Sequence, residues 1–223
     1  MAQVSFGLFM TKDAWNIWDK ANGKMQRFGQ TTIPPSLIAI CKGKTFEESK
    51  QEILKFNQRV YTSGIIESFI ISLEDYWSKI EGEFFRRLAK MTGNSFEDKI
   101  TGQITTIGTC PYNPEKSTFM VSLFSHLPSA ICTCAHEIMH LHFHKFDFAR
   151  IEKQIGTEKT HDLREALTVL LNLEFRDLLI GGDKGYEQHL PLRKFIVTEW
   201  EKENDYPKLL DKCVEYFKNN KYN

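Results

Sequence analysis

The chain lacks three things: an apolar run long enough to cross a bilayer, an excess of charge of either sign, and a paired set of cysteines. A membrane-spanning helix needs roughly 20 consecutive apolar residues, and no segment approaches that length. Lysine plus arginine and aspartate plus glutamate number 29 each, and the basic residues are spread along the chain. We therefore expect neither nucleic acid nor a membrane as a partner.

Cysteine usage and the N-terminus indicate the compartment. The five cysteines are an odd, scattered set, unlike the framework of a small secreted domain. The first ten residues have neither the basic start nor the long apolar stretch of a signal peptide. We therefore predict a soluble protein of the reducing cytoplasm.

What is present is enough material for a folded core: 223 residues, of which 41% are hydrophobic and 13% aromatic. Thr45 and Glu48 form a capping-box pattern that predicts a helix to about residue 61. Apolar residues at three- and four-residue steps predict a long helix between Gly64 and Gly93. Further expected elements, which make the fold class α+β, are strands at 100–107 and 118–124 and helices at 128–146, 163–179, 193–202 and from Pro207.

The first 60 residues carry weaker signals. Residues 4–10 favour a short strand, Thr11 is a candidate cap for a brief helix, and the prolines at 34–35 break regular structure. We predict that residues 1–60 are an N-terminal extension packed on the core and that residues 61–223 form the main domain.

The most informative stretch reads HExxH and comprises His136, Glu137, Ile138, Met139 and His140. Residues four apart on a helix project from the same face, so His136 and His140 can bind one metal ion together. Glu137 lies roughly a quarter-turn away, near enough to accept a proton from water activated by that ion.

A catalytic zinc site needs a third protein ligand, and Glu165 is the best candidate. Apart from Thr168 and Asn172, every residue that follows it as far as Leu173 is apolar, so its helix should be buried on most sides. A carboxylate in such a core is costly unless it is paired, protonated or bound to a cation. The alternative is a capping box, in which Asp162 caps the helix and Glu165 reaches back to the helix start.

The other histidines and the nearby cysteines fit a ligand role less well. His144 drifts off the metal-facing side of its helix, so we expect it beside the ligands or on the surface. His142 and His161 are expected to be solvated or capping residues. Cys132 and Cys134 lie at an apolar helix start, where buried neutral thiols are ordinary.

Two further features bear on how a substrate would bind. Tyr186, His189 and Arg193 lie in or beside a loop that can cover the site, and any of the three can stabilise an oxyanion. The strand at 118–124 directly precedes the metal-binding helix. Its edge is either exposed and able to pair with an extended peptide, or the strand lies within an ordinary sheet.

Two strands, an HExxH helix and a second helix carrying a glutamate resemble the zincin metallopeptidases of the gluzincin type. The HEIMHLHFH run and the downstream EALTVLLN stretch look most like the compact ImmA/IrrE-like metallopeptidases, over roughly residues 100–180. The resemblance implies a small twisted sheet packed on the HExxH helix and a glutamate helix, with additional N- and C-terminal helices. It also implies Zn²⁺ held by His136, His140 and Glu165, with Glu137 as general base.

The chain departs from the family at two positions. Val169 stands where larger gluzincins place an aspartate that orients a ligand histidine, so Thr168 or Asn172 would have to take over that role. Met139 stands where the ImmA/IrrE-like motif commonly has glycine.

Two functions follow from these observations. The leading hypothesis is a zinc-dependent metallopeptidase that hydrolyses a protein or peptide substrate. The alternative is a non-catalytic regulatory or scaffold protein that retains a zinc-binding zincin fold, which the missing aspartate and the unfamiliar N-terminal third favour.

Overall fold

The computed structural model describes residues 2–23 and 33–219. The chain divides into two compact units, each assembled from segments that are far apart in the sequence. Unit 1 contains residues 80–98 and 131–219 together with the first described residues, and unit 2 contains residues 4–79 and 99–130 apart from the undescribed ones. The fold is mixed α+β, as expected, while the proposed boundary at residue 60 stays a prediction.

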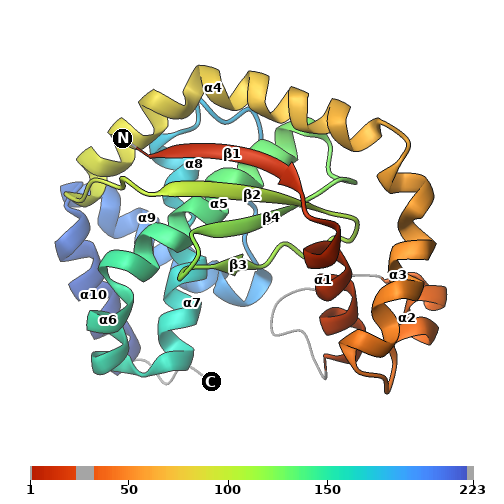
Figure 1. Ribbon diagram of the computed structural model, residues 1–223. Coiled ribbons are helices and arrows are strands. Elements are labelled where there is room, and N and C mark those ends of the chain that lie inside the picture. The colour runs from red at the N-terminus through yellow and green to blue at the C-terminus, as the bar shows by residue number, and fades with distance from the viewer. Residues whose placement is uncertain (1, 24–32, 220–223) are drawn as a thin grey trace. The chain divides into compact units, whose positions relative to one another are not determined.

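A mixed four-stranded sheet is formed by β1 (Gln3–Leu8), β2 (Lys99–Thr105), β3 (Tyr112–Asn113) and β4 (Thr118–Ser122). Its strand order is β1-β2-β4-β3 (Figure 1). Strands β2 and β4 are parallel, with Gln103 opposite Met120, and β3 pairs antiparallel with β4. Because β4 lies between two strands, the prediction of an exposed edge at 118–124 is wrong, and the ordinary sheet strand is confirmed.

Three helices of unit 2 pack against one another: α1 (Met10–Asn22), α2 (Pro35–Cys41) and α3 (Phe46–Tyr61). The predicted capping box is present at the start of α3, since Thr45 Oγ1 accepts from Glu48 N and the Glu48 carboxylate accepts from Thr45 N. Two other predictions are wrong. Thr11 lies inside the first turn of α1 instead of capping it, and Pro35 opens α2, because proline suits the first helical position.

A buried carboxylate joins α1 to its neighbours in unit 2. Asp13 accepts hydrogen bonds from Tyr61 Oη at 2.7 Å, Thr105 Oγ1 at 2.7 Å, Thr106 N at 2.8 Å and Thr106 Oγ1 at 2.6 Å. These donors offset the cost of burying the charge. Since Tyr61 ends α3 and Thr105 ends β2, this carboxylate holds α1 against both elements.

The long amphipathic helix predicted between Gly64 and Gly93 is α4 (Ile65–Thr92). Both glycines have positive φ, at 76° and 77°, a backbone conformation that glycine adopts readily. Most of the buried apolar side chains follow the expected three- and four-residue steps, namely Ile66, Leu73, Trp77, Ile80, Phe84 and Leu88, and Phe85 beside Phe84 is buried as well.

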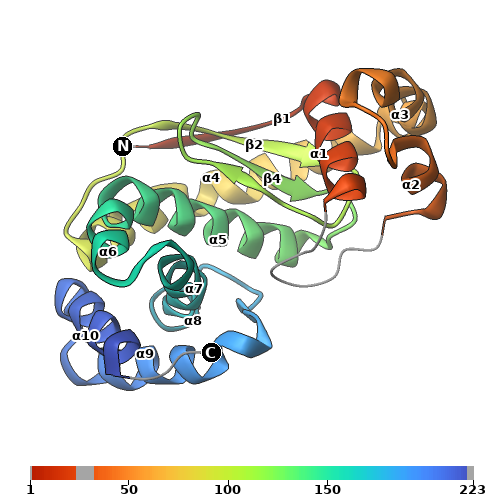
Figure 2. The ribbon, with the colours of Figure 1, turned by 90° about the horizontal axis from the view of Figure 1, so that it is seen from below.

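Helices dominate unit 1 (Figure 2). Pro128 lies in the first turn of the HExxH helix, where proline is tolerated. The elements after α5 (Leu127–Phe146) are α6 (Phe148–Ile155), α7 (Thr157–Leu167), α8 (Leu170–Glu174), the 3₁₀ turn η1 (Glu187–His189), α9 (Leu190–Glu203) and α10 (Tyr206–Asn219). Helix α9 contacts α7 and α10, and α6 contacts the same two helices.

The single helix predicted at 163–179 is wrong. Helix α7 begins as early as Thr157 and ends at Leu167, α8 covers only Leu170–Glu174, and residues 175–179 lie outside both helices. Between the two helices, Val169 N donates to Ala166 O and Leu171 N donates to Thr168 O, so the chain tightens into three-residue turns. In the described part of the chain, no helix combines the length and the apolar character needed to cross a membrane.

Candidate metal centre

Helix α5 presents the two histidines of the HExxH motif on one face. The imidazole rings of His136 and His140 lie one turn apart, with centroids separated by 4.3 Å and planes inclined by 73°. The helix is held from several sides, because Ile138, Met139 and Leu141 are buried. The pair is therefore fixed on a rigid element and is not carried by a loop.

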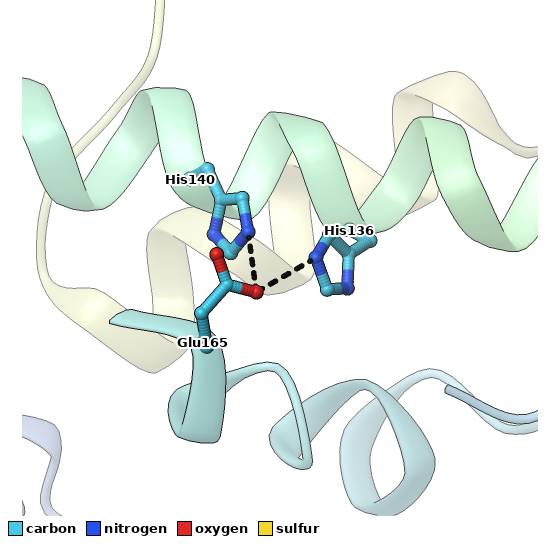
Figure 3. A group of neighbouring side chains, drawn as sticks. All are labelled: His136, His140 and Glu165. Atoms are coloured by element: carbon cyan, nitrogen blue, oxygen red, sulfur yellow. Dashed lines mark ion pairs between the residues drawn. The ribbon is translucent and has the colours of Figure 1, made fainter. Parts of the chain in front are cut away.

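Glu165 reaches this pair from α7 (Figure 3). Its Oε2 atom lies 3.5 Å from His136 Nε2 and 3.3 Å from His140 Nε2. We compared the histidine, cysteine, aspartate and glutamate side chains of the described residues. His136, His140 and Glu165 form a group that can hold a metal ion, because their ligand atoms lie within 4.8 Å of one another. The alternative role for Glu165 is excluded, since α7 begins at Thr157 and Asp162 lies inside it instead of capping it.

The geometry of the three donors fits a bound cation. Metal–ligand bonds of about 2.0–2.1 Å in a tetrahedral site place neighbouring ligand atoms about 3.3 Å apart, which matches the contacts of Glu165 Oε2. This oxygen is buried and makes no ordinary hydrogen bond to any described residue. The other oxygen, Oε1, accepts a hydrogen bond from Arg164, which leaves Oε2 to bind a metal ion alone.

A carboxylate that sequence reasoning missed orients His136. Asp183 Oδ1 accepts a hydrogen bond from His136 Nδ1 at 2.8 Å, so the ring presents Nε2 towards Glu165. Asp183 Oδ2 lies 2.8 Å from Thr168 Oγ1 and 2.8 Å from an Arg193 guanidinium nitrogen. Asp183 lies in a loop, and no spacing rule relates it to Glu165 or to the HExxH motif.

The two residues expected to orient a ligand histidine act on Asp183 instead of on the histidine. Asn172 accepts from Asp183 N and donates to Asp183 O, both at 2.8 Å, and so fixes the loop backbone. Thr168 Oγ1 is within hydrogen-bond distance of both Glu165 O and Asp183 Oδ2. The prediction located the right helix region but missed the residue that touches His136.

Tyr186, His189 and Arg193, the three candidates for stabilising an oxyanion, lie in different surroundings. Arg193 forms an ion pair with Asp183, and His189 Nε2 lies 3.2 Å from Asp162 Oδ1. Tyr186 is half-buried near the metal-binding group. Burial, together with the negative charges of nearby carboxylates, raises the pKa of Tyr186 to about 12, so its phenol keeps its proton at neutral pH.

The electrostatics of the site favour a cation. Burial raises the pKa of the Glu137 carboxyl to about 8, and the charge of Glu165 adds to this shift while His136 opposes it. Burial lowers the pKa of His136, but the hydrogen bond to Asp183 and the nearby Glu165 carboxylate outweigh it and raise the pKa to about 10. The site therefore holds protons near neutral pH that a bound metal ion would displace.

The remaining histidines and the two cysteines lie outside the group of three. His142 is buried, so of its two expected roles the solvated one is wrong; its Nε2 lies 3.2 Å from Asn94 O, beside the C-terminal end of α4. His144 stacks on Phe148 with centroids 4.2 Å apart. His161 lies within α7, with its Nδ1 atom 3.1 Å from an Arg164 guanidinium nitrogen. The Cys132 thiol donates a hydrogen bond to Gly181 O, and Cys134 is buried.

No family model, no curated protein and no solved structure matches this chain.

Proposed function

We propose, as a first step, that the protein is a metal-dependent hydrolase. The observation that carries this proposal is the approach of Glu165 Oε2 to both imidazoles of the HExxH pair, with the carboxyl of Glu137 beside them. Three protein ligands leave a fourth position open for water or substrate, which distinguishes catalytic from closed structural sites.

As a second step, we propose that the metal is zinc and that the bond cleaved is a peptide bond. Two imidazoles and one carboxylate are a donor set that zinc favours in metallopeptidases. The resemblance to the zincins of the gluzincin type supports the peptide substrate, and the α+β fold is compatible with it. All five cysteines lie in the described residues as thiols without disulfides, which supports a cytoplasmic setting.

Bound zinc would supply a Lewis acid that polarises the substrate carbonyl and makes water nucleophilic near neutral pH. Glu137 accepts the proton of the attacking water and passes it to the leaving amine. Asp183 accepts a hydrogen bond from His136 Nδ1 and so holds the imidazole in place. The phenol of Tyr186 donates a hydrogen bond to the substrate carbonyl oxygen, on which negative charge develops.

Metal analysis combined with one substitution tests this proposal. The purified protein is expected to contain one zinc per chain and to cleave peptides from a denatured proteome. The Glu137→Gln variant should retain zinc and lose at least 10²-fold in cleavage rate. The control is Glu201→Gln, which removes a carboxylate from the exposed side of α9. Cleavage that persists in Glu137→Gln would show that another group acts as the base.

One observation favours the second candidate, a zinc-binding regulatory or scaffold protein. The site is almost closed, since Glu137 is 7%, His140 2% and Glu165 5% exposed. Stoichiometric zinc without cleavage of any peptide in the same proteome assay would support this candidate.

A further inference from the structure

A cleft of about 330 Å³ opens on the sheet of unit 2. Gln103 on β2 and Met120 on β4 are register partners and contribute to its lining. Helix α1 contributes Lys12 and Trp15, which lie three residues apart and therefore on one side of the helix. The segment that contains β3 contributes Tyr112. The cleft is thus built from three strands and one helix and lies within one compact unit.

The charge of this cleft is positive and unbalanced. Lys12 and Lys116 are the charged residues that line it, and no described residue forms an ion pair with either. A cleft in unit 1 differs, because its Glu83 pairs with Arg86 at 2.7 Å and with Arg87 at 2.6 Å. The cations of the unit 2 cleft therefore remain available to an anionic ligand.

The cleft also exposes apolar and aromatic surface. Trp15 is 43% exposed, whereas the indoles of Trp77 and Trp200 are buried. Tyr112 is half-buried and Met120 is buried in the lining. A ligand that covers Trp15 gains apolar contact, and an aromatic ring in the ligand can stack on the indole.

We propose that this cleft binds a short acidic peptide segment, in which glutamates or aspartates flank an aromatic side chain. The carboxylates pair with Lys12 and Lys116, and the aromatic side chain packs on Trp15. The equal numbers of basic and acidic residues favour a peptide over a nucleic acid, because a polyphosphate chain needs a longer track of cations than two lysines. The proposal does not depend on the function of the metal centre.

Binding to immobilised polymers tests this proposal. The probe is a random copolymer of glutamate and tyrosine, compared on the same sensor with a lysine–tyrosine copolymer and with oligothymidylate. The wild-type chain is expected to bind the glutamate–tyrosine copolymer, more weakly at higher salt. The Lys12→Glu/Lys116→Glu variant should lose at least tenfold in affinity, and Trp15→Ala roughly fivefold.

The matched control is Lys42→Glu/Lys55→Glu, which changes the net charge equally at two exposed lysines of unit 2 outside the cleft. This control should bind within twofold of the wild type, and circular dichroism checks that every variant is folded. Equal losses in both double variants would overturn the proposal, as would no binding of the acidic copolymer. Tighter binding of oligothymidylate or of the basic copolymer would also overturn it.

Discussion

His136 is held by a contact outside its own helix. Asp183 accepts the Nδ1 proton of His136 and is itself fixed by Thr168 and Arg193. Although burial opposes it, His136 and Arg193 hold the pKa of Asp183 at about 2, so this carboxylate is charged at neutral pH. A charged acceptor strengthens the hydrogen bond and raises the basicity of the imidazole as a ligand.

Replacement of Asp183 by Asn is therefore expected to weaken zinc binding by about 10–100-fold, since removing such a partner commonly has this effect. The measurement is competition with a chromophoric zinc chelator. Glu187→Gln is the control, because it removes one exposed negative charge from η1, a few residues after Asp183. Unchanged zinc affinity in Asp183→Asn would mean that His136 is oriented without this contact.

A second prediction at the scale of single residues concerns Tyr186. Because burial and the nearby carboxylates raise its pKa to about 12, its phenol can donate a hydrogen bond throughout the neutral range. The Tyr186→Phe variant should lower kcat about 10²-fold with little change in KM or zinc content. Tyr216→Phe on α10 provides the control. A change confined to KM would assign Tyr186 to substrate binding.

At the scale of elements, His142 couples α5 to the last residue of α4 and to the chain that follows it. Its Nε2 atom lies 3.2 Å from Asn94 O and 3.1 Å from Thr92 Oγ1, and donation to the carbonyl places the proton on Nε2. Burial lowers the pKa of His142 to about 4 from its ordinary value of 6.5. The folded state therefore binds this proton less readily than the unfolded state does.

The stability that His142 contributes is fully present above pH 6.5 and is lost as the pH falls towards 4. Relative to His142→Gln, the wild type should lose up to about 3 kcal/mol of unfolding free energy over that range. Urea unfolding at several pH values measures this difference. Parallel pH profiles for wild type and His142→Gln would contradict the prediction.

Elements whose signals lie within a few residues were predictable. The capping box at Thr45 and the helix between Gly64 and Gly93 depend on local hydrogen bonds and backbone conformation. The break between α7 and α8 was not predictable, because the run from Ala166 to Leu173, apolar except for Thr168 and Asn172, is equally compatible with one continuous helix. Thr168 lies at that break, and its side-chain oxygen is within hydrogen-bond distance of Glu165 O and Asp183 Oδ2.

At the scale of the whole molecule, the metal-binding residues all belong to unit 1 but come from two helices and depend on a loop. Because the unfolded chain cannot hold the three donors together, metal binding should stabilise the fold. Zinc at about 1,000 times its dissociation constant contributes about 4 kcal/mol, or roughly 10 °C in melting temperature for a chain of this size.

Thermal unfolding of chelator-treated protein, with and without added zinc, measures this stabilisation. Glu165→Gln should abolish most of the zinc-dependent rise, since it replaces the third ligand with a weaker donor. Magnesium is the control ion, because it prefers an octahedral set of oxygen ligands. An equal rise for both ions, or for wild type and Glu165→Gln, would contradict binding at this site.

The sequence alone determined the paired imidazoles and the neighbouring carboxyl of Glu137, because helical periodicity places residues four apart on one face. It also determined the α+β class and the buried stripe of α4, since both follow from local patterns of apolar residues. Only the tertiary structure decided that Glu165 meets the pair, that Asp183 supports His136 and that β4 is an inner strand. These contacts join residues far apart in the chain, and no local spacing encodes which distant segments come together when the core is packed.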